Sequence, residues 1–350
     1  MQLTTTTFGV LDEREINLFT IDNGNGLTVS LTNFGGIITS INTPDSQGRN
    51  ANVVLGYNGL HDYVKDQSYI GCIVGRYANR IKGGRCQIGG QLYNLFVNNG
   101  SNHLHGGKEG FNKRVWHPEP VREKRGCGVE LYYTSPDGEE GYPGTVDVQV
   151  TYLVTPNSQL IVKYRAATDR QTIINLTQHS YFNLAGSGTV LDHLIQINSS
   201  AYTPVTKDLL PDGTICSVEG TRFDLRQERK IRDLFSQAGS VELMEGGYDH
   251  NFVLDSSGDS SQPAASLYHP QSGRCLDMYT TEPGVQFYTA NHLPAEPTGG
   301  VSSRLCKHGA VCLEAQHFPD SPNQAGFPSV ILEPGHPYSQ VTTYRFGVRS

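Results

Sequence analysis

Two histidines stand two residues apart in front of a glycine pair in the stretch NHLHGG, residues 102–107. On a β-strand the side chains at positions i and i+2 share a face, so His103 and His105 could both reach one metal ion. Glu109 follows His105 at a spacing that cupin barrels use for metal ligands, but the spaced glycines and the later partner histidine of that pattern are missing. A polar turn that ends at the glycine pair is therefore the favoured interpretation, and a metal site is the alternative.

A third histidine lies in the stretch NLTQHSYFNLAGSG, residues 175–188. His179 is followed closely by Tyr181 and Phe182, and such neighbours partly remove an imidazole from water and hold its pKa near neutrality. A histidine of that kind can donate or accept a proton at physiological pH. The alternative is a core histidine that is bonded to a main-chain carbonyl.

Two carboxylates and two arginines complete the set of candidates. Asp249 ends a glycine-rich turn that leads into a strand-like run, so it either points into a cleft or forms an Asx turn. Glu314 directly follows the apolar run AVCL, so it either faces solvent, which is the favoured interpretation, or is buried, where its raised pKa suits a general base. Arg76 and Arg80 lie between apolar residues, and each needs an acceptor from a carboxylate or from a substrate oxygen.

The elements that must position these side chains have a period of two. In TVDVQVTYLV, residues 145–154, the buried face would hold Val146, Val148, Val150 and Tyr152, which alternate with polar residues as in a half-buried strand. Similar runs cover residues 27–33, 128–134, 159–166 and 284–291.

Turn signals separate these runs, and helical periodicity is limited to residues 59–66 and 229–237. We therefore expect an all-β protein, a large antiparallel β-sandwich with few short helices. The same pattern resumes on both sides of residues 256–265, which indicates a surface loop inside a single domain that covers residues 1–350.

Composition narrows the class of function. The net charge is −7, and no block of Lys or Arg occurs, so neither nucleic acid nor an anionic membrane surface is an expected partner. The N-terminal residues lack the basic and apolar regions of a secretory signal, and no apolar run approaches the roughly 18 residues that a membrane helix needs. The seven cysteines are scattered without a CxxC pair, which is typical of reduced thiols, and we expect a cytoplasmic protein.

Seven strings carry a family likeness: GRYANRI, NHLHGG, SPDGEEGYPG, NLTQHSYFNL, YDHNF, EPGVQFYT and LEAQHFPDSPN. In these strings and in their order the chain resembles the aldose 1-epimerase (galactose mutarotase) family, and an ending similar to LEPGHPYSQ extends the likeness over nearly the whole length. The resemblance implies the galactose mutarotase-like supersandwich and the interconversion of α and β anomers of free aldohexoses such as galactose and glucose. It also implies a monosaccharide as the partner, no cofactor, no metal, and a monomer or weak homodimer.

The resemblance implies roles for individual residues as well. Glu314 corresponds to the general base that takes the proton of the anomeric hydroxyl, and His179 to the general acid that protonates the ring oxygen. His105 corresponds to a sugar-binding residue near the same oxygen, whereas relatives carry serine at the position of His103, which stays outside the catalytic set. The other expected sugar-binding residues are Asn79, Arg80, Asp249 and Gln286. Tyr181 and Phe287 either stack on the apolar face of the sugar or are core aromatic residues.

A positioned acid and base suffice for this reaction. A cyclic hemiacetal opens when a base takes the O1 proton while an acid donates to O5, and the open aldehyde rotates and closes on its other face. We expect an ionised carboxylate and a protonated histidine to coexist near neutral pH. The alternatives are a glycoside hydrolase that uses Asp249 and Glu314 as its carboxylate pair, a sugar-binding module without activity, a cupin-like metalloenzyme and a hexose 6-phosphate epimerase.

Overall fold

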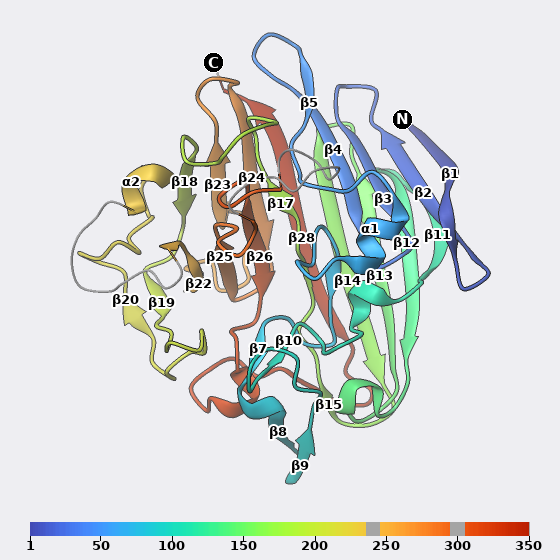
Figure 1. The fold of residues 1–350 in the computed structure, drawn as a ribbon, viewed down its shortest axis with the longest axis vertical. Helices are drawn as coiled ribbons and strands as arrows, with labels where there is room; N and C mark the ends of the chain where they lie inside the picture. The colour runs from blue at the N-terminus through green and yellow to red at the C-terminus, as the bar shows by residue number, and fades with distance from the viewer. Residues whose placement is uncertain (236–245, 295–304, 350) are drawn as a thin grey trace.

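The computed structural model describes residues 1–235, 246–294 and 305–349. Strands make up most of its regular structure, as the period-two pattern predicts (Figure 1). The α-helices of the described residues are α1 (Leu60–Lys65) and α2 (Ile231–Phe235), so the prediction of few short helices is confirmed. Residues 236 and 237 of the second predicted helix lie outside the described part of the chain.

The largest sheet has nine antiparallel strands in the order β11-β12-β13-β14-β28-β24-β23-β18-β21. Their bounds are His117–Glu123, Gly126–Ser135, Val146–Val154, Gln159–Thr168, Tyr338–Val348, Arg274–Thr280, Ala265–Tyr268, Leu194–Ile197 and Arg229–Lys230. On β13 the four apolar residues predicted to share a face are all buried. The alternation of side chains thus places one face of this sheet against the core.

A six-stranded sheet with the order β17-β26-β25-β22-β19-β20 packs within the same fold. Its strands are Tyr181–Phe182, Val311–Gln316, Gly284–Tyr288, Asp249–Val253, Ala201–Thr203 and Cys216–Ser217. Every residue of β25 and β26 is buried, because both faces of these central strands are covered. A polar side chain on either strand is therefore removed from bulk water.

The remaining strands form a five-stranded sheet and four short pairs. The five-stranded sheet runs in sequence order through β1 (Gln2–Leu11), β2 (Arg14–Asp22), β3 (Thr28–Thr32), β4 (Ile38–Pro44) and β5 (Asn50–Asn52). The short pairs are β6 (Ile73–Val74) with β16 (Thr177–Gln178), β7 (Arg80–Ile81) with β10 (His103–Leu104), β8 (Arg85–Ile88) with β9 (Gln91–Asn94), and β15 (Thr172–Ile173) with β27 (Ile331–Leu332).

One hydrophobic core joins the three large sheets. Ile21 of β2, Leu131 of β12 and Phe252 of β22 belong to the same cluster of buried side chains. Residues 256–264 form turns between β22 and β23, as the predicted surface loop requires. A core shared in this way is what a single domain over residues 1–350 needs, and that domain assignment stays a prediction.

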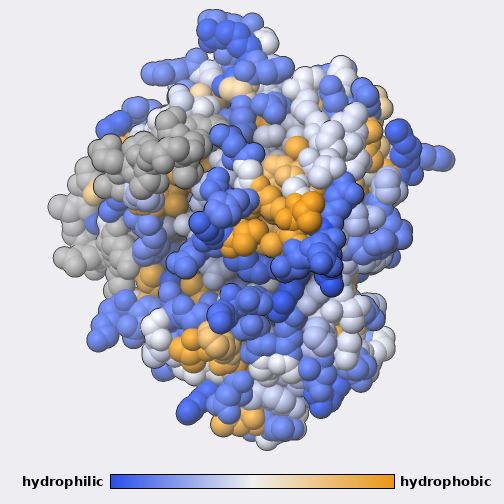
Figure 2. Space-filling model, turned by 45° about the vertical axis from the view of Figure 1, so that its right-hand side comes forward, coloured by the Kyte–Doolittle hydropathy of each residue, from blue (hydrophilic) through white to orange (hydrophobic). Residues whose placement is uncertain are grey.

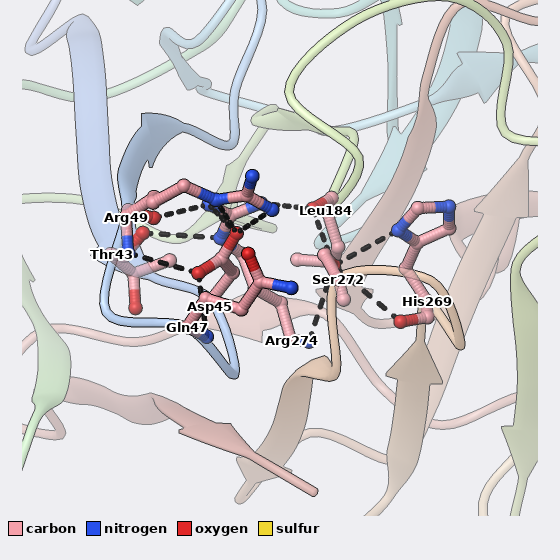
Figure 3. Close-up of polar contacts among 8 residues, drawn as sticks. All are labelled: Thr43, Asp45, Gln47, Arg49, Leu184, His269, Ser272 and Arg274. Atoms are coloured by element: carbon pink, nitrogen blue, oxygen red, sulfur yellow. Dashed lines mark hydrogen bonds and ion pairs between the residues drawn. The ribbon is translucent and has the colours of Figure 1, made fainter. Parts of the chain in front are cut away.

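The buried side chain of Arg274, on β24, connects the hairpin of β23 and β24 to β4 and the turn that follows it (Figure 3). The guanidinium of Arg274 donates hydrogen bonds to the main-chain carbonyls of Thr43, Leu184 and Arg49, at 3.1, 3.1 and 2.7 Å. The Asp45 carboxylate lies 4.0 Å from the same guanidinium. These contacts tie the five-stranded sheet to the nine-stranded sheet away from the candidate site.

The face in Figure 2 is largely hydrophilic, with apolar side chains gathered in a limited area near its centre. Large hydrophobic residues that are clearly exposed are few over the described chain, and Val10 is the most exposed of them at 68%. None of the described helices has the length and apolar character that crossing a membrane requires.

Candidate active site

A cavity of about 460 Å³ gathers most of the predicted site residues. Its walls come from separate elements: Arg80 from β7, Leu104 from β10, Asp249 from β22 and Glu314 from β26. The short pair of β7 and β10 and the six-stranded sheet that carries the two carboxylates thus line the same cavity. A volume of this size is enough for a small polar ligand.

Glu314 is held in the floor of the cavity by strand pairing. On β26 it lies directly opposite Gln286 of β25, within a strand whose residues are all buried. Burial raises the pKa of the Glu314 carboxyl well above its usual range, and the nearby charge of Asp249 raises it further, while Arg80 opposes the shift. A carboxyl group in this setting can both take and return a proton near neutral pH.

His179 lies between β16 and β17, and its main chain is fixed on both sides. The Gly71 N–H donates to its carbonyl at 2.9 Å, and its own N–H donates to the Cys72 carbonyl at 2.9 Å. The imidazole stacks on the Tyr181 ring at 5.1 Å between centroids and 20° between planes, and it is nearly parallel to the Tyr69 ring at 6.2 Å. Burial lowers the pKa of His179 to about 4.

The two candidate catalytic groups face each other. Nε2 of His179 lies 3.6 Å from Oε2 of Glu314, and neither Oε2 of Glu314 nor Nδ1 of His179 has a hydrogen-bond partner. Burial favours the uncharged form of each group, which favours one proton on the pair, held by the carboxyl group. This differs from the expected pair of ions, because desolvation opposes both charges at once.

A chain of polar contacts holds the second carboxylate. Nε2 of Gln286 donates to Oδ1 of Asp249 at 2.6 Å, and a guanidinium nitrogen of Arg80 lies 3.6 Å from Oδ2 of Asp249. Nε of Arg80 donates to Oδ1 of Asn99 at 3.1 Å. Arg80 and Asp249 line the cavity, whereas Gln286 does not, so Gln286 acts on the site through Asp249.

The two histidines of NHLHGG have separate environments. The strand geometry that would align them is not formed, because β10 ends at Leu104 and His105 has a left-handed backbone with φ of 51°. Nδ1 of His103 lies 2.7 Å from the Phe96 carbonyl and Nε2 lies 2.5 Å from the Tyr142 hydroxyl, which satisfies the ring inside the protein. His105 alone reaches the cavity, where its Nδ1 accepts the Asn79 N–H at 3.1 Å.

His105, His179 and Glu314 offer donor atoms that all lie within 4.8 Å of one another, a set that resembles the ligands of zinc. Ligation needs a free lone pair on each nitrogen that would bind the ion. Since Nδ1 of His105 already accepts a hydrogen bond, its Nε2 carries the ring proton and offers no lone pair. The arrangement therefore fits proton transfer better than it fits a metal ion.

Of the other predicted residues, some line the cavity and some lie outside it. Asn79 and Tyr181 also line the cavity. Phe287 does not, because it is fully buried in the main core against Tyr248 and Phe252. Phe287 follows Gln286 on β25 and so points to the opposite face of the sheet, which removes it from the candidate stacking residues. Arg76 is satisfied by Ser135 and by main-chain carbonyls and also lies outside the cavity.

Several cavity residues carry no sequence signal of their own. They are Gln67, Tyr69, Asn99, Lys207, Asp208 and His292. Tyr69 packs on His105 at 4.6 Å between ring centroids and has a left-handed backbone with φ of 57°. Positive φ in an aromatic residue marks a functional site in a structure, but nothing in the one-dimensional sequence announces it.

Comparisons with known proteins show which family the chain resembles. A family model described as aldose 1-epimerase matches residues 17–345. The chain is 44% identical over 324 residues to a galactose mutarotase of Bos taurus, with 92% of each protein covered, and 35% identical over 338 residues to an aldose 1-epimerase of Escherichia coli (strain K12), with 96% of each covered.

Solved structures are similar over the same length. A galactose 1-epimerase from Lactobacillus acidophilus NCFM superposes with a TM-score of 0.88 at 29% identity, covering 100% of this chain and 99% of that one. An aldose epimerase homologue from C. elegans superposes with a TM-score of 0.86 at 31% identity, covering 95% and 99%. The predicted antiparallel supersandwich is thus confirmed.

Proposed function

The chain belongs to the aldose 1-epimerase family and is a mutarotase, an isomerase that acts on carbohydrates, and we propose that it interconverts the anomers of free aldohexoses such as galactose and glucose. The observation that carries the proposal is the 3.6 Å separation of His179 and Glu314 inside a buried cavity. O1 and O5 of a pyranose are bonded to the same carbon, so an acid and a base that face each other can serve both oxygens.

In the proposed mechanism Glu314 is the general base and His179 is the general acid. Glu314 takes the proton of the anomeric hydroxyl while His179 donates a proton to the ring oxygen, and the C1–O5 bond breaks to give the open-chain aldehyde. Rotation about C1–C2 presents the other face of the carbonyl. His179 then removes the proton from O5 as it attacks C1, and Glu314 returns the proton to O1.

This mechanism needs the ionised form of the pair at the start of ring opening. In the empty cavity burial favours the uncharged forms of both groups. Sugar hydroxyls that replace water at Oε2 of Glu314 and at the His179 ring supply the hydrogen bonds that the charged forms need. Proton exchange across 3.6 Å then leaves the number of protons in the site unchanged.

Other residues of the cavity hold the sugar. Arg80 and Asp249 offer donors and acceptors for ring hydroxyls, and Asn79 adds a side-chain amide. Gln286 supports Asp249. Tyr181, which lines the cavity, is the remaining candidate for contact with the apolar face of the sugar.

We propose further that the enzyme works without a cofactor, in the cytoplasm, as a monomer or weak homodimer, and without nucleic-acid or membrane partners. Cys72, Cys86, Cys127, Cys216, Cys275 and Cys312 are free thiols, which suits a reducing compartment. The reaction transfers no electrons and no group, so a cofactor would have no role in it.

Polarimetry on freshly dissolved α-galactose tests the assignment. The wild type should speed the decay of optical rotation in buffer with EDTA, and Glu314→Gln, which keeps the shape but cannot take a proton, should abolish the effect. No acceleration by the wild type with galactose, glucose or xylose would overturn the proposal. Release of reducing sugar from a glycoside would point instead to hydrolysis by Asp249 and Glu314.

A further inference from the structure

Two hydrogen bonds join Asn79 and His105, one between their main chains and one from the Asn79 main chain to a ring nitrogen of His105. The Asn79 N–H donates to Nδ1 of His105 at 3.1 Å, and the His105 N–H donates to the Asn79 carbonyl at 3.2 Å. Both residues have left-handed backbones, with φ of 67° and 51°. Such conformations are uncommon outside glycine, and asparagine and histidine are among the residues that tolerate them best.

The side chain of Asn79 supports the same geometry. Its Oδ1 accepts the N–H of the next residue, Arg80, at 2.8 Å, which holds the amide group against its own main chain. Both Asn79 and His105 are nearly buried, so water does not compete for these bonds. The ring of His105 is further restrained by Tyr69, at 4.6 Å between centroids.

Counting hydrogens fixes the state of the His105 ring. A main-chain N–H can only donate, so Nδ1 must keep its lone pair and cannot carry a hydrogen. The single ring hydrogen is then on Nε2. A second proton could be added only at Nδ1, where it would meet the hydrogen of the Asn79 amide. His105 is therefore restricted to one neutral tautomer, and burial also lowers its pKa, with smaller contributions in the same direction from His179 and Arg80 nearby.

We propose that the Asn79 main chain locks His105 as a permanent neutral hydrogen-bond donor, which binds the ring oxygen through Nε2–H and never transfers a proton. Asn79 is then a positioning residue in addition to any contact of its side chain with the sugar. This inference rests on the proposed mutarotase reaction for its functional part. The two histidines then have different roles at the ring oxygen of the sugar. His105 orients this oxygen, and His179 alone protonates it.

A donor with a fixed hydrogen has a specific use here. Negative charge develops on an oxygen as the hemiacetal opens and closes, and a preorganised donor stabilises that charge without reorganising. If both histidines could take up protons, each would compete for the single proton that Glu314 and His179 share. The lock removes His105 from that competition.

The matched variants are Asn79→Gly and Asn79→Val. Both remove the side-chain amide, so both should raise KM if that amide binds the sugar. Glycine keeps the main-chain N–H and adopts positive φ freely, whereas the β-branched valine disfavours it strongly. We expect Asn79→Val to lower kcat by about 10²-fold relative to Asn79→Gly, the usual effect of losing one such donor.

Nitrogen-15 NMR of the histidine rings gives the direct readout. His105 in the wild type and in Asn79→Gly should show a hydrogen on Nε2 only, with no titration between about pH 5 and pH 8, where free histidine titrates. A His105 ring that titrates in this range, or that carries its hydrogen on Nδ1, would overturn the lock. So would an Asn79→Gly variant that loses as much kcat as Asn79→Val.

The same measurements separate this inference from the proposed function. A locked tautomer in a protein without mutarotase activity would leave the geometry correct and the assigned reaction wrong. Full mutarotase activity with a His105 ring that titrates would show that the assigned reaction is correct and the locked tautomer is wrong. If Asn79→Val does not fold, the wild-type spectrum and the Asn79→Gly variant still decide the question.

Discussion

Nε2 of His179 lies 3.6 Å from Oε2 of Glu314, and no hydrogen bond joins the two groups. This separation is too short for a substrate atom to lie between them. β17, which follows His179, pairs with β26, which carries Glu314, and this pairing sets the distance. Because both side chains are buried, each favours its uncharged form, and the pair behaves as a unit that holds one proton.

The first prediction concerns the dependence of kcat/KM on pH. The acid limb, where the pair gains a second proton, should lie near the lowered pKa of His179, about 4, instead of near the ordinary value of about 6.5. The alkaline limb, where the last proton leaves, should follow the raised pKa of Glu314. Polarimetric rates on galactose, measured from about pH 4 upwards, give both limbs, and an acid limb near about 6.5 would contradict a buried neutral imidazole.

The charge of Asp249 supplies a second prediction. It raises the pKa of both His179 and Glu314, so Asp249→Asn should move both limbs of the profile to lower pH as well as raise KM. Gln286→Met is the matched control, since it removes the hydrogen bond to Asp249 without changing any charge. That control should raise KM and leave the limbs in place. Equal shifts in the two variants would mean that the effect is structural.

The third prediction concerns the stacking of Tyr181 on His179. Tyr181→Leu removes the ring that holds the imidazole in plane, and a small misplacement of a catalytic group lowers kcat, here by about tenfold. Tyr181→Phe keeps the ring and loses only the hydroxyl, which donates to the Ser68 carbonyl at 2.8 Å. Steady-state rates of both variants test the point. Equal losses in the two would assign the effect to the hydroxyl.

How much of this could be predicted from the sequence depends on the range of the interaction. Val146 to Tyr152 alternate strictly, and alternation alone predicted a strand with its buried face. The roles of Glu314 and His179 were suggested by family strings and stay predictions. The sequence left Phe287 open between the sugar and the core, and the structure places it in the core, because a strand pattern shows which residues share a face and not which face meets the cavity. The left-handed backbones of Tyr69, Asn79 and His105 depend on contacts between distant segments, which a single sequence does not reveal.

The fourth prediction tests the buried Arg274 contacts of Figure 3. Arg274→Leu removes one donor each from the carbonyls of Thr43, Leu184 and Arg49, of which Leu184 keeps the Ser272 hydroxyl as a second donor, and we expect it to lower the free energy of unfolding by about 2 kcal/mol or more. Urea denaturation measures the loss, and KM should not change in the folded fraction.

The matched control for Arg274 is Arg345→Leu. Arg345 is about half exposed and pairs with Asp277 at 2.7 Å, and such a surface pair contributes about 1 kcal/mol at most. A loss for Arg274→Leu that is no larger than that of the control would show that water enters to satisfy the three carbonyls.

The last prediction is a loss of stability in acid that originates outside the cavity. Burial lowers the pKa of His103 to about 4, of His193 to about 3 and of His250 to about 4. In the unfolded chain these histidines titrate near about 6.5. The unfolded state therefore binds more protons between these values, so their contribution to stability is complete above about pH 6.5 and is lost as the pH falls toward about 4. Each histidine contributes a slope of about 1.4 kcal/mol per pH unit within that window.

Urea titrations at about pH 7.5, 6 and 5 measure this slope. His193→Gln is the comparison, because an amide gains no proton over this range and can still accept the Leu184 N–H that Nε2 of His193 accepts at 3.0 Å. The variant should lose less stability than the wild type as the pH falls. If the two proteins lose the same amount, groups other than His193 govern the loss of stability in acid, since only this histidine differs between them.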